Sequence, residues 1–461
     1  MSGVVVIGGG ISGLAAAYYL SRTGRACTLV EPLPCLGGVI RTESVDGCVV
    51  EAGPDSFISQ KPWALQLIRE LGLAGEVIGS QDRLRKTYIL RRGRLVPMPD
   101  GLYLMVPTAV APIAATRLLS LSTKIRMAWE LLRRPPDFPP SDRSVADFVH
   151  DHYGEEAVRY LAEPLLAGIY GGDPGRLSIQ SVLPRFAEFE QQYGSVTRGV
   201  LASRRASSGQ APPLFQSLKR GMQQFTEALV EAISGSVTTV RTEVQRLERR
   251  ESGYRVSGPG LSLDAGNVVL AVPAYIAGAL LRPLDEALAG LLSAIPYHSS
   301  VTVALGYDRA GFRQPLNGFG FLIPRVERRL LTAGTWVGTK FPHRVAENRV
   351  LLRAFIGAGD REELLSQSDD WLVEAVREEL GRLLGLTQTP LFTRVQRWRR
   401  AMAQYTVGHL RRMDEVNARL TRLPGLHLAG NAYLGIGVPD CVRTAQLAAA
   451  RISGQAGAVR G

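Results

Sequence analysis

The sequence predicts a mixed α/β protein whose central element is a parallel sheet covered by helices. Three observations predict this class. An apolar, β-branched run, Val4–Ile7, passes through a glycine-rich turn into a helix-like run, Leu14–Leu20. A second apolar run follows at Ala26–Val30. Near the other end of the chain, residues 425–452 repeat the order of strand, glycine-rich turn and helix. Such units build parallel sheets with helices on both faces.

The first glycine-rich turn has the spacing of a dinucleotide-binding motif. Gly8, Gly10 and Gly13 form G-x-G-x-x-G, which suits a tight turn and a close approach of the backbone to a pyrophosphate. The following helix begins with unpaired N–H groups that favour an anion. Glu31, which ends the second run, can accept hydrogen bonds from ribose hydroxyls. We therefore predict a Rossmann-like dinucleotide-binding domain. The alternative is a glycine-rich turn in another kind of parallel sheet.

A second motif, G-G-x-x-R-T, lies directly after the Glu31 strand. Gly37 and Gly38 let the backbone pass close to a cofactor, and Arg41 can neutralise a phosphate. The alternative is a glycine turn followed by a surface arginine, which the neighbouring first motif disfavours. Together the two motifs resemble the flavin-containing amine oxidase superfamily, in which this loop contacts FAD. The resemblance implies non-covalently bound FAD rather than NAD.

The composition restricts the class of partner. The chain has 461 residues, enough for two or three domains, and a net charge of +12. Such a positive charge could favour binding to nucleic acid, to an anionic membrane surface or to an acidic small molecule. Because the arginines are scattered and no nucleic-acid motif is present, we expect no nucleic-acid partner. Whether the chain works alone or as a homodimer is left open by the sequence.

The cysteines and histidines indicate neither a metal site nor a redox pair. The four cysteines form no C-x-x-C motif, and the six histidines form no H-E-x-x-H motif. Few cysteines in a long chain fit a reducing compartment. The N-terminus enters the first strand at once, so we expect no secretory signal. The expected location is the cytoplasm, with peripheral contact to the cytoplasmic membrane left open.

Residues 102–121 are rich in apolar side chains, but they do not predict a transmembrane helix. Pro107, Pro112 and Arg117 interrupt the run, whereas a span needs about twenty largely apolar residues in one helix. Residues 124–134 mix apolar and basic positions at helical spacing, as in helices that lie at a membrane interface. The alternative is a solvated helix that packs on its own domain.

The remaining elements are predicted from apolar periodicity and from turn residues. We expect helices at residues 62–79, at 144–161 with Ser144 as N-cap, at 214–233 and at 369–384, and a loop at 203–213. We expect strands at residues 87–90, 237–240, 244–248, 254–256, 268–272, 301–307, 318–323, 330–335, 350–356 and 392–398.

The last glycine-rich stretch again offers backbone N–H groups to an anion. Gly430 follows a short apolar strand, and Gly435 and Gly437 lead into the helix that begins near Val438. Two such turns at opposite ends of one chain predict a single cofactor held by both ends.

Three further stretches are more specific: residues 162–174, 215–222 and 397–409. Together with residues 51–57 and 430–441, they resemble the oxygen-dependent porphyrinogen oxidases, which act on protoporphyrinogen IX or on coproporphyrinogen III. The resemblance covers the chain from end to end. It implies an FAD enzyme that removes six electrons from a porphyrinogen and passes them to oxygen, with hydrogen peroxide as product.

The resemblance also implies roles for single residues. It assigns to the ADP part of FAD the residues Gly8, Gly10, Gly13, Glu31, Gly38 and Arg41. It assigns to adenine the backbone of Val244, to the flavin and its surroundings Trp398, Gly430, Gly435 and Val438, and to the substrate Gly168.

The chain departs from this pattern in two places. Ala403 stands where a proline usually precedes Gln404. Where an arginine often meets a substrate propionate, the nearest basic residues are Arg85 and Lys86, which we take as candidates to line the substrate site.

The implied chemistry requires no catalytic base. A porphyrinogen has hydridic meso C–H bonds, and flavin can accept that hydride while pyrrole protons leave to water, so the cofactor performs the difficult step. Asp55 can accept a hydrogen bond from a pyrrole N–H, or it is an exposed turn carboxylate. His409 is expected to be structural rather than site-lining.

We expect three domains. The FAD-binding domain combines residues 1–84, 213–295 and 425–461, a mixed-sheet substrate domain combines 85–93 and 296–424, and residues 94–212 form a helical domain with potential membrane contact. The favoured reaction is oxidation of protoporphyrinogen IX in haem biosynthesis, and the first alternative is oxidation of coproporphyrinogen III. Less favoured are another amine oxidase-type reaction and a non-catalytic binding protein of the same architecture.

Overall fold

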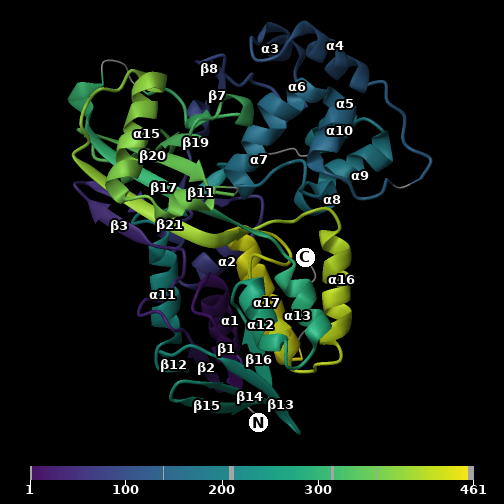
Figure 1. Cartoon of the computed structure of the whole chain (residues 1–461), viewed down its shortest axis with the longest axis vertical. Coiled ribbons are helices and arrows are strands. Elements are labelled where there is room, and N and C mark those ends of the chain that lie inside the picture. The colour runs from purple at the N-terminus through teal and green to yellow at the C-terminus, as the bar shows by residue number, and fades with distance from the viewer. Residues whose placement is uncertain (1–2, 139, 207–211, 313–315, 360, 455–461) are drawn as a thin grey trace.

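The computed structural model describes residues 3–138, 140–206, 212–312, 316–359 and 361–454. Figure 1 shows three regions. The lower half holds a sheet between helices, a second sheet lies at the upper left, and a group of helices lies at the upper right. The fold is therefore the mixed helix-and-sheet class that the sequence predicts.

The lower region is built on a five-stranded parallel sheet. Its strands, in spatial order, are β12 (Val237–Val240), β2 (Cys27–Val30), β1 (Val4–Ile7), β16 (Asn267–Leu270) and β22 (Leu426–Leu428). All four residues of β1 are buried, as expected for the centre of a sheet covered on both faces. The beginning, middle and end of the chain thus contribute neighbouring strands to one sheet.

Helices far apart in the sequence cover this sheet. α1 (Ile11–Ser21) packs against α17 (Val438–Ile452) and α11 (Gln223–Ile233), and their apolar side chains form one core with the sheet. The region also contains the following elements: α2 (Trp63–Glu70), β13 (Arg246–Arg250), β14 (Gly253–Gly258), β15 (Leu261–Ala265), α12 (Ala274–Leu281), α13 (Glu286–Ser293) and α16 (His409–Leu420). β3 (Thr42–Val45) and β4 (Cys48–Glu51) form a hairpin that lies beside the second sheet.

The upper-left region is a seven-stranded mixed sheet. In spatial order it contains β21 (Phe392–Ala403), β17 (Tyr297–Asp308), β20 (Arg349–Gly357), β19 (Ala333–Trp336), β18 (Gly320–Leu322), β7 (Thr87–Arg91) and β8 (Arg94–Pro97). The β18–β7 pair is parallel and the other pairs are antiparallel. α15 (Asp369–Leu384) contacts this sheet, and its bounds match the predicted helix because Ser368 caps it and Gly385 ends it in the left-handed region.

The upper-right region is helical apart from the short strands β9 (Leu102–Tyr103) and β10 (Val106–Pro107). Its helices are α3 (Val110–Ala115), α4 (Leu121–Glu130), α5 (Val145–Tyr153), α6 (Glu155–Ala157), a π-helical turn (Val158–Ala162), α7 (Glu163–Tyr170), α8 (Ile179–Val182), α9 (Pro184–Tyr193) and α10 (Val196–Ala206). No helix in the described ranges combines the length and apolar character needed to cross a membrane.

The structure confirms the predicted N-cap of the 144–161 helix and corrects its length. Ser144 Oγ accepts a hydrogen bond from the Asp147 N–H, as a cap should. The helix ends at Tyr153 because Gly154 adopts a φ of +89°. The chain then continues through α6 and the π-helical turn rather than as one straight helix.

The predicted helix at residues 214–233 is wrong in its first turns. Residues Phe215–Leu218 form a strand, β11, between β5 (Phe57–Ile58) and β6 (Val77–Gly79). The pattern of apolar residues in such a short run does not distinguish helix from strand, and pairing with two distant strands decides it. Likewise, α10 extends to Ala206, inside the expected loop 203–213, of which residues 207–211 lie outside the described residues.

Candidate functional site

The turn between β1 and α1 is shaped by close backbone contacts. A Cβ on Gly13 would lie 1.8 Å from the carbonyl oxygen of Gly8, and Gly8 itself has a φ of +106°. At Gly10, the N-cap of α1, a Cβ would face open space. No side chain caps this helix. The first N–H groups of α1 therefore point out of the fold at a position where a backbone can approach an anion closely.

Glu31 lies beside this turn. Its carboxylate accepts a hydrogen bond from the Gly9 N–H at 2.7 Å and another from the Leu33 N–H at 2.9 Å. These bonds orient the carboxylate at the carboxyl edge of the parallel sheet, where ligands of such sheets bind. Val244, predicted to contact adenine, is buried in the segment between β12, the strand that pairs with β2, and β13.

The G-G-x-x-R-T loop lies against the same turn. The Gly37 N–H donates to the Gly9 carbonyl at 2.8 Å, and a Cβ on Gly38 would be 3.2 Å from the Cα of Gly10. Arg41 is exposed. The hydrogen bond from its Nε to the Gly38 carbonyl holds the near end of its guanidinium group. Its guanidinium has no carboxylate partner among the residues that the structure describes, so it is available to an external anion.

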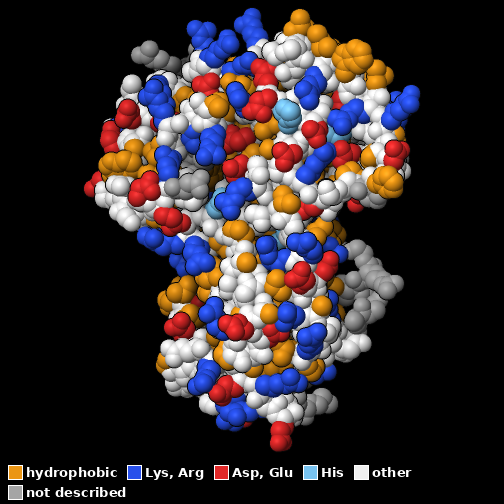
Figure 2. Space-filling model, turned by 45° about the vertical axis from the view of Figure 1, so that its right-hand side comes forward, with side chains coloured by type: hydrophobic (Ala, Val, Ile, Leu, Met, Phe, Trp, Pro, Cys, Tyr) orange, Lys and Arg blue, Asp and Glu red, His pale blue; other side chains and the backbone are white. Residues whose placement is uncertain are grey.

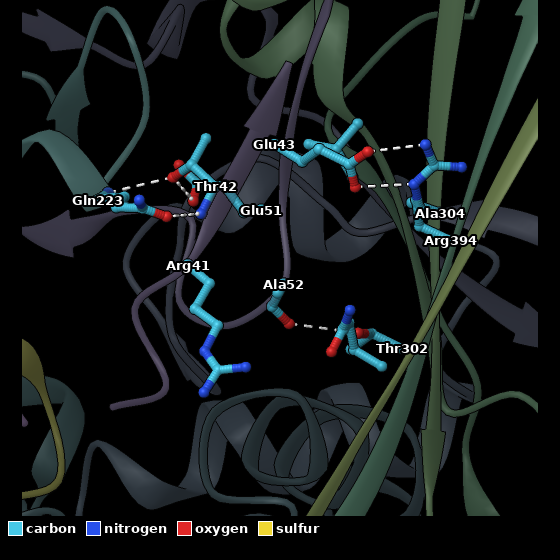
Figure 3. Close-up of a pocket in the computed structure, with 11 residues that line it drawn as sticks. Arg41, Thr42, Glu43, Glu51, Ala52, Gln223, Thr302, Ala304 and Arg394 are labelled. Atoms are coloured by element: carbon cyan, nitrogen blue, oxygen red, sulfur yellow. Dashed lines mark hydrogen bonds and ion pairs between the residues drawn. The ribbon is translucent and has the colours of Figure 1, made fainter. Parts of the chain in front are cut away.

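A cavity of about 240 Å³ separates this loop from the seven-stranded sheet. Thr42 and Gln223 line one side, while Thr302 of β17 and Arg394 of β21 line the other. Figure 3 shows that Arg394 is held by Glu43, whereas the Arg41 side chain points away from that pair. Within this cavity, Arg41 is therefore the cation without a bound carboxylate.

The C-terminal glycine turn reaches the same edge of the sheet, since β22 runs parallel to β1 with β16 between them. The Gly430 N–H donates to Thr444 Oγ1, and the Gly435 N–H donates to the Tyr405 hydroxyl at 2.7 Å. Gly435 cannot carry a side chain, because its Cβ would lie 2.3 Å from the Asp440 carboxyl carbon. The turn leads into α17 at Val438, which is buried.

Lys61 ties this turn to the N-terminal part of the chain. Its ammonium group lies 2.7 Å from the Asp440 carboxylate, which also accepts a hydrogen bond from the Gly437 N–H. The two glycine-rich turns that the sequence shows at opposite ends of the chain are therefore brought to one side of one sheet.

The stretches around residues 168 and 404 meet at the boundary between the helical region and the mixed sheet. Gln404 Nε2 donates to the Tyr170 carbonyl at 2.8 Å, and His298 Nδ1 lies 2.6 Å from the Gly171 carbonyl oxygen. Gly168 is exposed on α7, and a Cβ there would be 3.3 Å from the Leu322 side chain of β18. Ala403 ends β21 in a pair with Tyr297.

One of the two interpretations of Asp55, that it is an exposed turn carboxylate, is wrong. Its side chain is only 21% exposed and lies 3.0 Å from Lys340 Nζ. Burial opposes ionisation of this carboxyl, but Lys340 and Arg353 outweigh it and hold the pKa of Asp55 well below its usual value. Asp55 is therefore a permanent anion in a cluster of cations.

Arg85 and Lys86 lie on the surface before β7. Both are exposed, and one guanidinium nitrogen of Arg85 lies 4.0 Å from the Asp82 carboxylate. The cations that reach the centre of the fold are instead Lys340, Arg344 and Arg353, all of them buried. Sequence reasoning missed these three because no motif marks them: Lys340 and Arg344 each end a short helical turn, and Arg353 stands in β20.

His409 is buried beneath the C-terminal turn. Its ring stacks on Tyr405 with centroids 4.0 Å apart, and Nε2 lies 3.3 Å from the Tyr433 carbonyl oxygen. Burial lowers the pKa of His409 to about 4, so the ring is neutral at physiological pH. Within the described ranges, His, Cys, Asp and Glu side chains nowhere gather in groups of three or more that could hold a metal ion.

Comparison with known families and proteins identifies similar molecules over nearly the whole chain. The model of the family described as flavin containing amine oxidoreductase matches residues 11–453. A coproporphyrinogen III oxidase of Bacillus subtilis is 35% identical, and the alignment covers 95% of each chain. A chloroplastic protoporphyrinogen oxidase of Nicotiana tabacum is 31% identical over 98% of this chain and 85% of its own.

A solved structure has the same fold throughout. It is a protein of Exiguobacterium sp. 255-15 described as a candidate protoporphyrinogen oxidase, with a TM-score of 0.87 and 32% sequence identity over 98% of both chains. The parallel sheet, the mixed sheet and the helical region therefore all have counterparts in one known molecule.

Proposed function

Because this chain belongs to the flavin-containing amine oxidoreductase family, it is an FAD-dependent oxidoreductase, and we propose that it oxidises a porphyrinogen in haem biosynthesis. The observation that carries the proposal is the junction of α7 with the end of β21, where Gln404 binds the Tyr170 carbonyl. This junction joins two of the stretches that resemble porphyrinogen oxidases, residues 162–174 and 397–409. Relatives named for such oxidations match the chain from end to end, which supports the same conclusion.

The residues at the sheet edge fit FAD. The uncapped start of α1, the open space beside Gly10 and the unpaired Arg41 guanidinium suit a diphosphate, while the Glu31 carboxylate beside the turn suits ribose. We propose that the turn from Gly435 to Val438 holds the flavin end of the same molecule. When bound, FAD supplies the acceptor for a hydride from the substrate.

For the substrate, we propose coproporphyrinogen III ahead of protoporphyrinogen IX, although the motifs alone favour protoporphyrinogen IX. Bacterial relatives named for coproporphyrinogen III have 29–35% identity, and three of them, at 35%, 34% and 32%, exceed the chloroplastic relatives named for protoporphyrinogen, which have 29–31%. Coproporphyrinogen III carries propionates where protoporphyrinogen IX carries vinyl groups, and the net charge of +12 suits the more anionic molecule. Protoporphyrinogen IX remains the second candidate.

The decisive experiment compares both porphyrinogens with the purified, FAD-loaded protein. Porphyrin fluorescence follows the product, and an oxygen electrode with a peroxide assay follows the electron acceptor. We expect oxygen consumption, peroxide formation and a higher kcat/KM for coproporphyrinogen III. A higher kcat/KM for protoporphyrinogen IX would overturn the proposed preference. Turnover of an amine without turnover of either porphyrinogen would overturn the reaction itself.

We also propose that the protein acts in the cytoplasm and touches the cytoplasmic membrane through α4. Leu121, Ile125 and Trp129 follow one another at four-residue intervals, and Leu132 stands just beyond the helix. Their exposed fractions are 73%, 49%, 66% and 71%. Figure 2 shows hydrophobic side chains gathered along the upper edge of the molecule, in the region of α3 and α4. Lys124 and nearby arginines provide the cations that favour anionic lipid.

The opposite face of α4 packs inward through Thr123, Met127 and Glu130, which leaves the apolar stripe facing outward. Sedimentation with anionic phosphatidylglycerol vesicles and with neutral phosphatidylcholine vesicles tests this contact. We expect binding to the anionic vesicles, and loss of that binding when Leu121 and Trp129 are both replaced by Glu. Equal behaviour of the variant and the wild type would exclude α4 as the contact.

A further inference from the structure

The carbonyl oxygen of Ala52 is the meeting point of three donors from the mixed sheet. Trp398 Nε1 of β21 donates at 2.9 Å, a terminal guanidinium nitrogen of Arg353 in β20 at 3.1 Å, and Thr302 Oγ1 of β17 at 3.4 Å. Figure 3 shows the Ala52 carbonyl directed toward Thr302. A carbonyl oxygen has only two lone pairs, so three donors exceed its usual number of partners. Because these donors come from three strands, they fix the position of the oxygen closely.

The other side of the same turn contacts the G-G-x-x-R-T loop. The Ala52 N–H donates to the Arg41 carbonyl at 2.9 Å, and a Cβ on Gly53 would lie 1.9 Å from the Val39 carbonyl oxygen. The Ala52–Gly53 turn is therefore wedged between the proposed cofactor loop and the mixed sheet. Ala52 thus bonds both to the loop that carries Arg41 and to the indole of Trp398.

Arg353 donates two of the hydrogen bonds that hold the Ala52–Gly53 turn. Besides Ala52, it donates to the Gly53 carbonyl at 2.5 Å, and the residue is only 4% exposed. Its Nε has no partner among the described residues. Burial of a cation with an unpaired N–H is costly, so its presence needs a compensating role.

The surroundings of Arg353 carry an excess of positive charge. Lys340, Arg344 and Arg353 face the carboxylates of Asp55 and Glu51, which leaves one cation unbalanced among the described residues of this cluster. All five side chains are largely screened from solvent. Charges that water does not screen act over longer distances than surface charges do.

We propose that Arg353 is a positioning residue for the flavin, which holds the Ala52–Gly53 turn in place and supplies a buried positive charge beside the cofactor. A flavin gains negative charge when it accepts electrons, and a nearby unscreened cation favours that form. Arg353 thereby raises the reduction potential of the bound cofactor and strengthens its binding. The inference rests on the FAD part of the proposed function and does not depend on the identity of the substrate.

Four variants of the full-length, FAD-reconstituted protein test this role. Arg353→Met removes the charge and both hydrogen bonds, Arg353→Lys keeps the charge, and Trp398→Phe removes one donor to Ala52 without a change in charge. Arg349→Met is the matched control, since Arg349 lies on the same strand but pairs with Asp46 at the surface. Urea unfolding of each variant verifies that it is folded.

The readouts are the midpoint potential of bound FAD and its dissociation constant, neither of which needs a porphyrinogen. We expect Arg353→Met to shift the midpoint to a more negative potential and to raise the dissociation constant at least about tenfold. Arg353→Lys should keep the potential near that of the wild type, and Trp398→Phe should weaken FAD binding without a comparable shift in potential. Arg349→Met should change neither quantity.

The outcomes separate this proposal from the proposed reaction. If the folded Arg353→Met variant has the wild-type potential and FAD affinity, Arg353 has no role toward the flavin. If Arg353→Lys shifts the potential as far as Arg353→Met does, the positive charge is not the cause and the proposal fails. If instead the wild-type protein oxidises no porphyrinogen, the assignment of substrate fails while these flavin measurements remain valid.

Discussion

The G-G-x-x-R-T motif suggests that Arg41 binds a phosphate, and the structure shows which groups surround its guanidinium. Its Nε is bonded to the Gly38 carbonyl, while its guanidinium lacks a carboxylate partner in the part of the chain that the structure describes. Arg394, on the opposite wall of the same cavity, is paired with Glu43. The pattern G-G-x-x-R-T marks the first arginine, but only the spatial arrangement distinguishes an unpaired cation from a neutralised one.

We expect Arg41→Ala to weaken FAD binding. A hydrogen bond to a charged group contributes about 1.5–3 kcal/mol, so the dissociation constant should rise by roughly ten- to a hundredfold. Flavin absorbance retained after gel filtration, and fluorescence titration with FAD, measure the effect. Arg394→Ala is the matched control and should retain flavin. Unchanged occupancy in Arg41→Ala would show that the loop does not contact the diphosphate.

We expect the buried His409 to make the free energy of unfolding fall more steeply as the pH becomes acidic than it would without this residue. Its pKa drops from an ordinary value near 6.5 to about 4 on burial, so between these values the unfolded chain binds the proton more readily. The stability that neutral His409 contributes is full above about pH 6.5 and is lost as the pH falls toward 4.

Replacement of His409 by Phe keeps a ring for the stack on Tyr405 and removes the titrating group. We expect the midpoint of urea unfolding to depend less on pH between about 4 and 6.5 in this variant. His150→Phe is a control, because His150 is 51% exposed. If the pH dependence of His409→Phe equals that of the wild type, the titration of His409 does not contribute.

At the scale of elements, α4 is anchored to the helical region by one buried network. His152 of α5 lies 2.9 Å from Glu130 of α4 and 3.0 Å from Glu190 of α9, one carboxylate at each ring nitrogen. Each ring nitrogen of His152 therefore lies within hydrogen-bond distance of a carboxylate, a group that only accepts hydrogen bonds when it is ionised. Burial works to raise the pKa of Glu130 and Glu190, but hydrogen bonds, first of all from His152, hold both values below the ordinary 4.5.

We expect His152→Phe to destabilise the protein strongly. The change removes one hydrogen-bonding partner from each of two buried carboxylates, and a buried group left without its partner costs about 1–3 kcal/mol, or more when it is charged. The free energy of urea unfolding measures it, and the accompanying exposure of α4 should appear as faster proteolysis between α4 and α5. His150→Phe, two residues away on the exposed face, should stay within about 0.5 kcal/mol of the wild type. Equal stability of both variants would contradict this role of the network.

Elements with strong local signals were predictable, and elements defined by distant pairing were not. The bounds of α15 follow from Ser368, Gly385 and an amphipathic pattern, all within one segment. The strand at Phe215–Leu218 exists because β5 and β6 pair with it from far away in the sequence, and its short apolar pattern fits a helix equally well. Local propensity is overridden wherever backbone hydrogen bonds come from distant segments.

At the scale of the whole molecule, the expected cofactor site draws on both ends of the chain and on the middle. Lys61 holds Asp440, and the Ala52–Gly53 turn is held by three strands of the mixed sheet. A ligand at this position contacts segments that lie far apart in the sequence. Binding should therefore stabilise the molecule as a unit.

We expect FAD to raise the thermal unfolding temperature of apoprotein in a concentration-dependent manner. A ligand at about one hundred times its dissociation constant adds about 2.7 kcal/mol to the free energy of unfolding. Differential scanning fluorimetry with FAD, and with NAD as the comparison dinucleotide, tests this. NAD should produce little change, and a shift of equal size with both ligands would contradict the assignment of FAD.

The sequence by itself determined the fold class, the family resemblance and the cofactor, because these depend on short motifs. Glycine spacing, a terminal acid and a loop arginine act through neighbouring backbone, so their meaning is readable from Gly8 to Arg41 without the rest of the chain. Tertiary structure alone decided which charges are buried. Lys340, Arg344 and Arg353 stand in unremarkable sequence positions, and they gather behind the Ala52–Gly53 turn only because folding brings residues 340–353 against the distant residues 51–55.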